Sequence, residues 1–271
     1  QRRSALLTFV IVGGGPTGVE FAGALRELIV YVLSQDIPTV SAAESRIILV
    51  EASDSLLTAM PEDLRQYAHS KLRTMGVEVL LDNRVVGATA ESVELYGGAV
   101  IASHTLFWSA GVAAAELAAS LNDVERGAGG RVMVLPDLSI NGYPEVFVVG
   151  DMACCFQQGM PLPMMAPVAG QQGDYVARVI LAREQGKTLP PFHYFDKGSM
   201  ATIGRSSAVA TAAGFKFRGY IAWLAWLLLH LYYLIGFRNR IVVMMNWTYA
   251  YWFQERQVRI ITAKKRRAVS V

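Results

Sequence analysis

The first fifty residues alternate between short apolar runs and one longer helical repeat. The β-prone run 8–12 predicts a buried strand, and it leads directly into three glycines. Apolar side chains then recur at helical spacing up to residue 33, and a second apolar run at 46–50 ends in Glu51. A strand, a glycine turn, a helix and a second strand in this order are typical of a nucleotide-binding parallel α/β sheet.

Shorter elements are predicted further along the chain. Pro61 and the two acids after it begin a helix that Gly76 ends. Gly97 and Gly98 predict a hairpin turn between two strands. The remaining predicted elements are strands at 77–81, 84–89, 92–96, 105–108, 131–135 and 146–149, helical stretches at 114–121 and 168–184, and a hairpin of 200–203 with 208–212.

Two apolar runs lie near the C-terminus. Residues 219–237 carry no formal charge when His230 is neutral, whereas the run 241–253 has 13 residues, fewer than the roughly 20 needed to cross a bilayer. Aromatic residues near both ends of the first run fit a spanning helix, but an aromatic stripe at spacings of three and four fits a helix lying in the interface. We expect two helices lying in one leaflet; the alternative is a buried helical hairpin that packs on the body or forms a dimer.

Charge is divided between a basic tail and an acidic body. From Lys216 to the end there are ten Lys and Arg and one acid, so the remaining 15 basic and 21 acidic residues give the body a net charge of −6. The net charge of +3 therefore comes from the tail, and no nucleic-acid partner is expected for the globular part. The basic cluster 264–267 would meet anionic lipid headgroups.

Cysteines and histidines suggest little chemistry. Cys154 and Cys155 are adjacent, which gives neither a disulfide framework nor a C-x-x-C motif and is typical of an intracellular protein with reduced thiols. The four histidines lie in separate sequence contexts, so no metal site is expected.

The glycine turn has the spacing of a dinucleotide-binding fingerprint. Gly13 permits the tight turn, Gly15 lets the backbone approach a diphosphate, and Gly18 lets the helix pack closely on the strand. The open helix N-terminus attracts the anion. Glu51 would accept hydrogen bonds from an adenosine ribose and repel a 2′-phosphate, and no Arg or Lys follows within ten residues, so NAD(H) is favoured over NADP(H).

Two other strand ends are candidate ligand sites. Ala110 and Gly111 follow an apolar strand, where small residues let a flat cofactor lie close to the backbone; a simple turn is the alternative. Gly150 and Asp151 place a carboxylate at the C-terminal edge of a strand, where open α/β sheets bind ligands, although an ordinary Asp N-cap would also explain the pair.

Taken in order, these motifs resemble the type II NADH:quinone oxidoreductases, single-chain membrane-bound flavoenzymes of respiratory chains. The resemblance extends over essentially the whole chain, and its most specific part is the Asp-Lys-Gly motif together with the C-terminal anchor. The motifs are the glycine fingerprint with Val-Glu-Phe-Ala-Gly, then Ser-Ala-Gly-Val, Val-Gly-Asp-Met-Ala, Ala-Pro-Val-Ala-x-Gln-Gln-Gly, Asp-Lys-Gly-Ser-Met-Ala-Thr-Ile-Gly-Arg and the basic amphipathic C-terminus.

This resemblance implies an α/β, Rossmann-like fold of the flavoproteins that bind two dinucleotides. It implies an NADH-binding domain at 1–112, the second half of an FAD-binding domain at 113–214, and amphipathic membrane-anchoring helices with a basic tail at 215–271. In the family a first FAD half precedes the NADH domain, whereas this sequence begins at the NADH domain and has one glycine fingerprint. We expect a C-terminal fragment that by itself holds FAD poorly or not at all.

Site residues also follow from the resemblance. Glu20 would approach the nicotinamide end, and Gln171 would act on the quinone side. Pro167 stands where the family has a first glutamine, so quinone orientation would depend on Gln171. The implied cofactor-binding residues are Gly13, Gly14, Gly15, Gly18 and Glu51 for NADH, and Ala110, Gly111, Gly150, Asp151 and Ala169 for the FAD crevice.

The implied reaction is hydride transfer from NADH to FAD, followed by reduction of a membrane quinone without proton pumping. The protein would lie peripherally on the cytoplasmic face of the inner (cytoplasmic) membrane, bound to the lipid bilayer through its C-terminal helices, with a homodimer left open. Two other functions remain: a soluble-type flavoprotein reductase for a redox protein, although no redox dithiol pair is present, and a non-catalytic NAD-binding membrane module.

Overall fold

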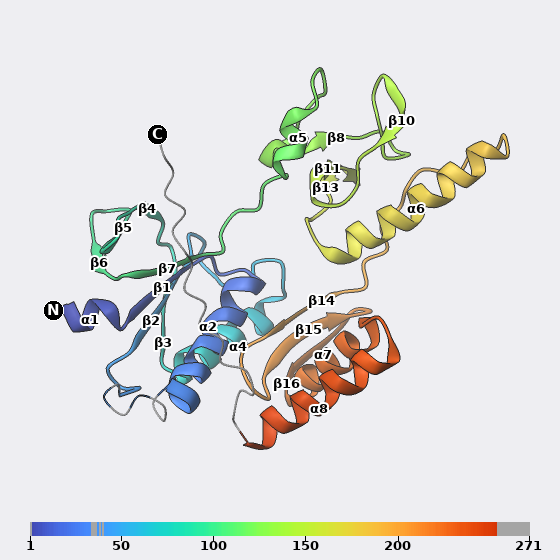
Figure 1. The fold of residues 1–271 in the computed structure, drawn as a ribbon. Helices are drawn as coiled ribbons and strands as arrows, with labels where there is room; N and C mark the ends of the chain where they lie inside the picture. Colours follow the sequence, from blue (N-terminus) through green and yellow to red (C-terminus); the bar gives the residue numbers. More distant parts are fainter. Residues whose placement is uncertain (1, 34–36, 38, 40, 254–271) are drawn as a thin grey trace, which may run out of the picture. The chain divides into compact units, whose positions relative to one another are not determined.

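The computed structural model describes residues 2–33, 37, 39 and 41–253. Within them the chain forms two compact units, one of residues up to 110 and from 199 onward, the other of residues 111–198 (Figure 1). The segment 199–212 thus packs with the N-terminal part of the chain. The functional division at 112 and 214 stays a prediction, since compactness alone does not assign a cofactor to either part.

A four-stranded parallel sheet forms the centre of the first unit, in the order β3-β2-β1-β7. The strands are β1 (Thr8–Val12), β2 (Arg46–Val50), β3 (Val77–Leu80) and β7 (Thr105–Trp108), and the associated helices are α1 (Arg2–Leu6), α2 (Pro16–Leu28) and α4 (Glu62–Thr74). This is the predicted α/β arrangement. The predicted first helix is α-helical only to Leu28 and continues as a π-helical segment, η1 (Ile29–Leu33).

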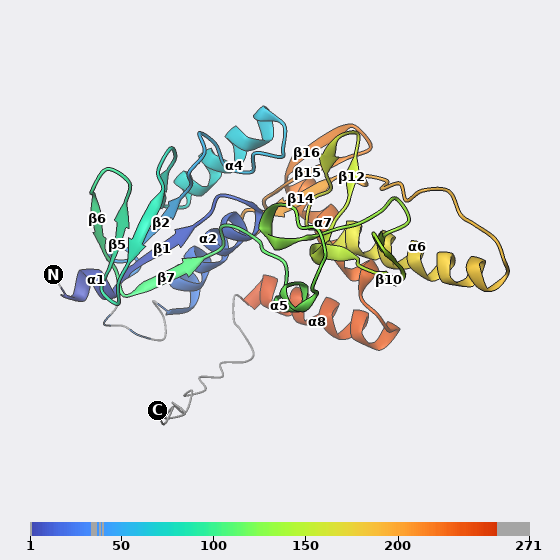
Figure 2. The same cartoon turned by 90° about the horizontal axis from the view of Figure 1, so that it is seen from above.

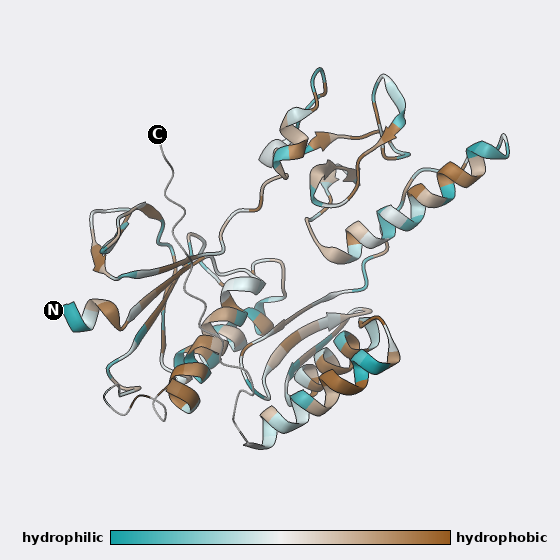
Figure 3. Ribbon diagram, viewed as in Figure 1, coloured by the Kyte–Doolittle hydropathy of each residue, from teal (hydrophilic) through white to brown (hydrophobic). Residues whose placement is uncertain are grey.

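The two faces of the sheet bury different side chains because residues alternate along a strand. On one face Ile11, Ile47 and Leu49 pack with apolar residues of α2 and α4. On the other face Val10 and Ile48 pack against the antiparallel sheet β4 (Val85–Ala88), β5 (Ser92–Leu95) and β6 (Val100–Ala102). Burial on both faces explains why the central strands are almost continuously hydrophobic (Figure 3).

The hairpin turn predicted at Gly97 and Gly98 is confirmed. It joins β5 to β6, and the two glycines have φ values of 94° and 86°. Strand β6 is not among the predicted strands because it has only three residues. It forms through its hydrogen bonds to β5.

The predicted second hairpin is confirmed and extended by one strand. Strands β14 (Ser199–Thr202), β15 (Ala208–Ala212) and β16 (Phe215–Gly219) form an antiparallel sheet. Helix α7 (Tyr220–Tyr233) follows β16 directly, and its buried Ala222 packs against Ala208 and Ala210 of β15. Helix α8 (Phe237–Phe253) lies beside α7 in both views (Figure 1, Figure 2).

The apolar run 219–237 is therefore not one continuous helix. Helix α7 ends at Tyr233, Leu234 is extended, and Gly236 has a φ of 85°, which separates α7 from α8. Within the described part of the chain, no helix is both long enough and apolar enough to cross a membrane. The basic cluster 264–267 lies outside the described residues.

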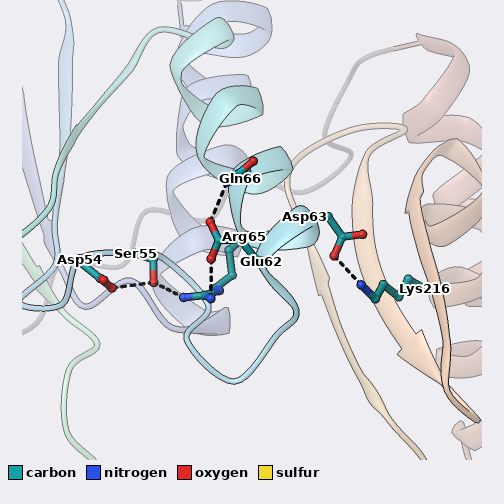
Figure 4. Close-up of polar contacts among 7 residues, drawn as sticks. All are labelled: Asp54, Ser55, Glu62, Asp63, Arg65, Gln66 and Lys216. Atoms are coloured by element: carbon teal, nitrogen blue, oxygen red, sulfur yellow. Dashed lines mark hydrogen bonds and ion pairs between the residues drawn. The ribbon is translucent and has the colours of Figure 1, made fainter.

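The N-terminus of α4 is connected to β16 by an ion pair. Glu62 and Asp63 occupy the first turn of α4, as predicted. Lys216 of β16 donates from Nζ to Asp63 at 2.8 Å (Figure 4). Arg65 pairs with Glu62 and donates to Ser55 Oγ at 2.7 Å, which fixes the loop before the helix.

The second unit contains short strand pairs around one long helix. Its elements are α5 (Glu116–Ser120), η2 (Ala128–Gly130), β8 (Val132–Met133), β9 (Ser139–Ile140), β10 (Tyr143–Phe147), η3 (Gly150–Met152), β11 (Ala153–Cys154), β12 (Phe156–Gln157), β13 (Met160–Pro161) and α6 (Ala166–Glu184). The pairs are β8 with β11, β9 with β10, and β12 with β13. The strand predicted at 131–135 is shorter than expected because β8 pairs over only two residues with β11. Both cysteines are free and buried.

Candidate functional site

The glycine turn between β1 and α2 has the conformation that a fingerprint requires. Gly13 has a φ of 107°, which side chains rarely adopt, and its N–H donates to the Val50 carbonyl at 2.9 Å. A Cβ on Gly18 would lie 1.8 Å from the Gly13 carbonyl oxygen. A Cβ on Gly15 would meet no protein atom within 4 Å. The fold therefore requires Gly13 and Gly18, whereas the space beside Gly15 is open to a ligand.

The N-terminus of α2 opens beside Gly15. Gly15 is the N-cap, Pro16 stands in the first turn, and among the described residues no side chain caps the helix. The backbone N–H groups of a helix's first turn have no partner within the helix. Together with the helix dipole they form a binding site for an anion such as a diphosphate.

Glu51 lies against this turn. One carboxylate oxygen accepts from the N–H of Gly14, and the other accepts from the N–H of Ser53 at 2.8 Å. A Cβ on Gly14 would lie 2.6 Å from the Leu56 side chain and 2.9 Å from Glu51 Cγ. The structure thus brings together the predicted glycines and the predicted carboxylate. The contact of Glu51 with a ribose stays a prediction.

The end of β7 closes the other side of the turn. Ser109 Oγ donates to the Val12 carbonyl at 2.7 Å, and a Cβ on Gly13 would lie 2.9 Å from the Ala110 nitrogen. Ala110 is therefore adjacent to the glycine turn, and the Ser109 hydroxyl holds this end of β7 to β1. The contact of Ala110 with a cofactor stays a prediction. Gly111 begins the second unit with a φ of 72°.

Two carboxylates of α2 bind the hairpin that begins with β14. Glu20 Oε1 accepts from the backbone N–H of Thr202 at 3.1 Å and from its hydroxyl at 3.4 Å. Glu27 accepts from the backbone N–H of Arg205. Seven residues separate the two glutamates, so they lie on one face of the helix. Glu20 is thus held by the hairpin, and Glu27 is a contact residue that the sequence analysis missed.

A cavity of about 590 Å³ lies between α2, the β14–β15 hairpin, α7 and α8. Its polar lining is Glu20, Glu27, Thr202, Arg205 and Thr248, and its aromatic lining is Tyr220, Trp223, Trp226, Trp247, Tyr251 and Trp252. The rings of Trp226 and Trp247 are 6.1 Å apart. A largely apolar cavity of this size with a few polar groups at one place is typical of a small-molecule site.

In the second unit, Gly150 is held against α6. Its N–H donates to Gln172 Oε1 at 2.7 Å, and a Cβ on it would lie 3.3 Å from Ala169 Cβ. Gln172 is fully buried, and its Nε2 has no hydrogen-bond partner among the described residues. Asp151 is exposed beside this group. The structure thus brings Gly150 and Ala169 together and adds Gln172, whose orphaned amide fits a ligand acceptor.

Gln171 is already engaged with the backbone. Its Nε2 donates to the Phe195 carbonyl at 2.9 Å, and its Oε1 accepts from the Phe195 N–H at 2.9 Å. Pro167 stands in the first turn of α6, where a helix does not need its N–H. The proline therefore fits the fold, and the quinone-side role of Gln171 stays a prediction.

Two family models match the chain. The family described as pyridine nucleotide-disulphide oxidoreductase matches residues 2–173, and the family described as the NDH2 C-terminal domain matches residues 196–256. The second match covers the β14–β15–β16 sheet, α7 and α8.

Two similar proteins of Mycobacterium tuberculosis are described as type II NADH:quinone oxidoreductases. The type II NADH:quinone oxidoreductase Ndh of Mycobacterium tuberculosis is 45% identical over 92% of this chain and 55% of its own length, and NdhA of the same organism is 40% identical over 97% and 57%. The chain thus spans about half the length of these relatives. The structure of NDH2 from Plasmodium falciparum in complex with NADH superposes with a TM-score of 0.84 at 16% identity, covering 95% of this chain and 68% of that one, which shows a shared fold.

Proposed function

Because the chain belongs to the pyridine nucleotide-disulphide oxidoreductases, and within them to the type II NADH:quinone oxidoreductases, we propose that it supplies the NADH-binding and quinone-side parts of an enzyme that passes electrons from NADH through FAD to a membrane quinone. One observation carries the proposal: the glycine turn with Glu51 lies in the same compact unit as the hairpin and helices that match the NDH2 C-terminal domain.

In this proposal NADH binds at the start of α2. The open space beside Gly15 and the uncapped helix N-terminus receive the diphosphate. Glu51, fixed by the N–H groups of Gly14 and Ser53, accepts from the adenosine ribose and disfavours a 2′-phosphate. Glu20, one turn into α2, faces the nicotinamide end.

Residues of the second unit would contact part of FAD. Gly150, Asp151 and Ala169 line the contact, and the unpaired Nε2 of Gln172 offers a buried donor. Gly111, at the start of this unit, would line the same cofactor. When bound, FAD accepts the hydride and returns electrons in pairs. Residues 111–198 carry no second glycine fingerprint, so these side chains would hold only a portion of FAD.

The quinone would use the aromatic cavity between α2, the hairpin, α7 and α8. Its tryptophans suit a flat ring with an apolar tail, and Glu20 with Thr202 lies at its polar side. Thr202, whose hydroxyl lies beside Glu20, would orient a quinone oxygen at this side. The exposed apolar residues of α7 and α8 would lie against the bilayer on the cytoplasmic face.

A quinone-side role of Gln171, which does not line this cavity, is tested separately. Gln171→Ala should slow quinone reduction more than flavin reduction by NADH, as stopped-flow absorbance would measure. The matched control is Gln185→Ala, an exposed glutamine at the C-terminus of α6, which should change neither rate. Equal losses in both half-reactions for Gln171→Ala would instead assign its amide to holding Phe195.

Titration of the purified protein with NADH and with added FAD tests the function as a whole. We expect NADH to bind more tightly than NADPH, and we expect NADH oxidation by a soluble quinone once FAD is bound. NADH binding without flavin binding or turnover would favour the non-catalytic membrane module. Turnover with a redox protein but with no quinone would favour the soluble-type reductase.

A further inference from the structure

A second cavity, of about 390 Å³, lies beside the C-terminal half of α2. Three cationic side chains from three different elements line it: Arg26 of α2, Lys71 of α4 and Arg205 of the β14–β15 turn. Among the described residues that line it, Glu27 is the only carboxylate, and Ser206 adds a hydroxyl. The cavity therefore carries a net positive charge.

Several donors in this cavity lack a protein acceptor. Arg26 donates from Nε to the Met75 carbonyl at 2.8 Å and from Nη1 to the Ala42 carbonyl at 3.1 Å, which leaves its Nη2 without an acceptor in the described part of the chain. Among the described residues the Lys71 ammonium has neither a hydrogen bond nor an ion pair. Cations held together in this way favour an anion between them.

The cavity adjoins the helices with the exposed apolar surface. Arg205 donates to the Ala250 carbonyl of α8, and its guanidinium lies 5.1 Å from the centre of the Tyr251 ring. The hydroxyls of Ser206 and Tyr251 are 3.2 Å apart. On α8, Met245 and Trp252 are 64% and 74% exposed. A ligand bound here would have its anion among the cations and its remainder near an apolar surface.

We propose that this cavity binds the phosphate group of an anionic phospholipid. The recognised chemistry is a phosphate with oxygen atoms for Arg26, Lys71 and Arg205, all of which donate and none of which accepts. A membrane lipid rather than soluble phosphate is the occupant because the cavity shares Arg205 and Ser206 with the contacts to α8. This cavity lies at the other end of α2 from the nucleotide turn, and it shares Glu27 and Arg205 with the lining of the aromatic cavity assigned to quinone.

The test compares Lys71→Gln with Arg73→Gln. Both residues lie on α4 and both substitutions remove one positive charge, but Arg73 is exposed and does not line the cavity. The measurement is cosedimentation of the purified protein with vesicles of phosphatidylcholine alone and of phosphatidylcholine mixed with phosphatidylglycerol. Lys71→Gln should weaken binding to the mixed vesicles about fivefold, while Arg73→Gln stays close to wild type. On neutral vesicles all three proteins should behave alike.

Three outcomes would overturn the proposal. Equal losses for both variants would indicate general attraction to the charged surface, and no loss for Lys71→Gln would remove the site. If inorganic phosphate raises the melting temperature of the wild type but not of Lys71→Gln, and vesicle binding is unchanged, the ligand is soluble phosphate. NADH titration of both variants is the independent check on the proposed function, because Lys71 lies outside the nucleotide site and NADH affinity should stay at the wild-type value.

Discussion

Gly15 and Gly18 lie three residues apart in one turn, yet their surroundings differ. Gly18 is pressed against the Gly13 carbonyl, whereas no protein atom approaches the position of a Gly15 side chain. Gly15 also has a φ of −70°, which alanine adopts without strain. Gly18 therefore allows the helix to pack on the strand, and Gly15 leaves space for a ligand.

This difference predicts that one alanine substitution weakens NADH binding and the other lowers the stability of the fold. Gly15→Ala should keep the wild-type melting temperature but weaken NADH binding about five- to hundredfold, because the methyl group would occupy diphosphate space. Gly18→Ala should lower the free energy of unfolding by about 1–3 kcal/mol or more. Thermal unfolding and NADH titration measure the two effects. Unchanged NADH affinity in Gly15→Ala would place the diphosphate elsewhere.

Glu51→Gln should narrow the preference for NADH over NADPH. The amide keeps one oxygen to accept from Gly14 or Ser53, but it no longer repels a 2′-phosphate, so we expect the ratio of kcat/KM values to fall about tenfold. Glu78→Gln, on the neighbouring strand β3 and half-exposed, is the control and should leave the ratio unchanged. An unaltered ratio in Glu51→Gln would remove this carboxylate from the ribose.

The glycines were predictable because they follow a strand directly and begin a helix, and Glu51 was predictable because it ends the next strand, β2, which pairs in parallel with β1. Glu27 and Gln172 were not. The partner of Glu27 is 178 residues away, and the burial of Gln172 depends on the loop at Gly150, 22 residues before it. Nothing in the spacing of polar residues along α2 or α6 reveals such partners.

At the scale of elements, the turn between α7 and α8 is the most exposed apolar feature of the hairpin they form. Ile235 and Phe237 are 88% and 78% exposed. Replacing both by Glu should reduce binding to lipid vesicles at least about tenfold, since each would otherwise bury a large apolar side chain, while the melting temperature stays unchanged. Tyr96→Glu with Val100→Glu, at the similarly exposed β5–β6 hairpin, is the matched control. Equal losses in both double variants would refute a specific membrane face.

Strands β2 and β3 are joined at their exposed ends by a bidentate ion pair. Arg46 donates to the two carboxylate oxygens of Glu78 at 2.9 Å and 2.8 Å. The hydrogen bonds from Arg46 lower the pKa of Glu78, with desolvation opposing them. Because the folded-state pKa is lowered, the pair stabilises the protein above the ordinary value of 4.5 and loses this contribution as the pH falls through the folded-state value.

Arg46→Gln should therefore cost about 0.5 kcal/mol of unfolding free energy at neutral pH, because both partners are half-exposed. The difference from wild type should vanish in acid below the folded-state pKa of Glu78. Chemical denaturation across this pH range measures it. A difference that is constant with pH would mean that the substitution acts through packing rather than through the charge of Glu78.

At the scale of the whole molecule, the order of elements and the α/β class followed from the sequence because the apolar period changes visibly between strands and helices. The sequence did not reveal that residues 199–212 would pack with residues 2–110, since Glu20 and Thr202 are 182 positions apart. It also predicted longer strands in the second unit than form there. Those strands pair over only a few residues, as β8 does with β11.

The core shared by the sheet and the late hairpin has a consequence for biosynthesis. Ile203 and Val209 are fully buried in the same cluster as Ile11 and Val19, so a ribosome must add about 100 further residues after β7, which ends at Trp108, before this core can be completed at Val209. At about 5–20 residues per second, helix α2 keeps part of its apolar face uncovered for several seconds. During that time the uncovered face of α2 is a binding surface for chaperones. It is buried only after the β14–β15 hairpin has been synthesised.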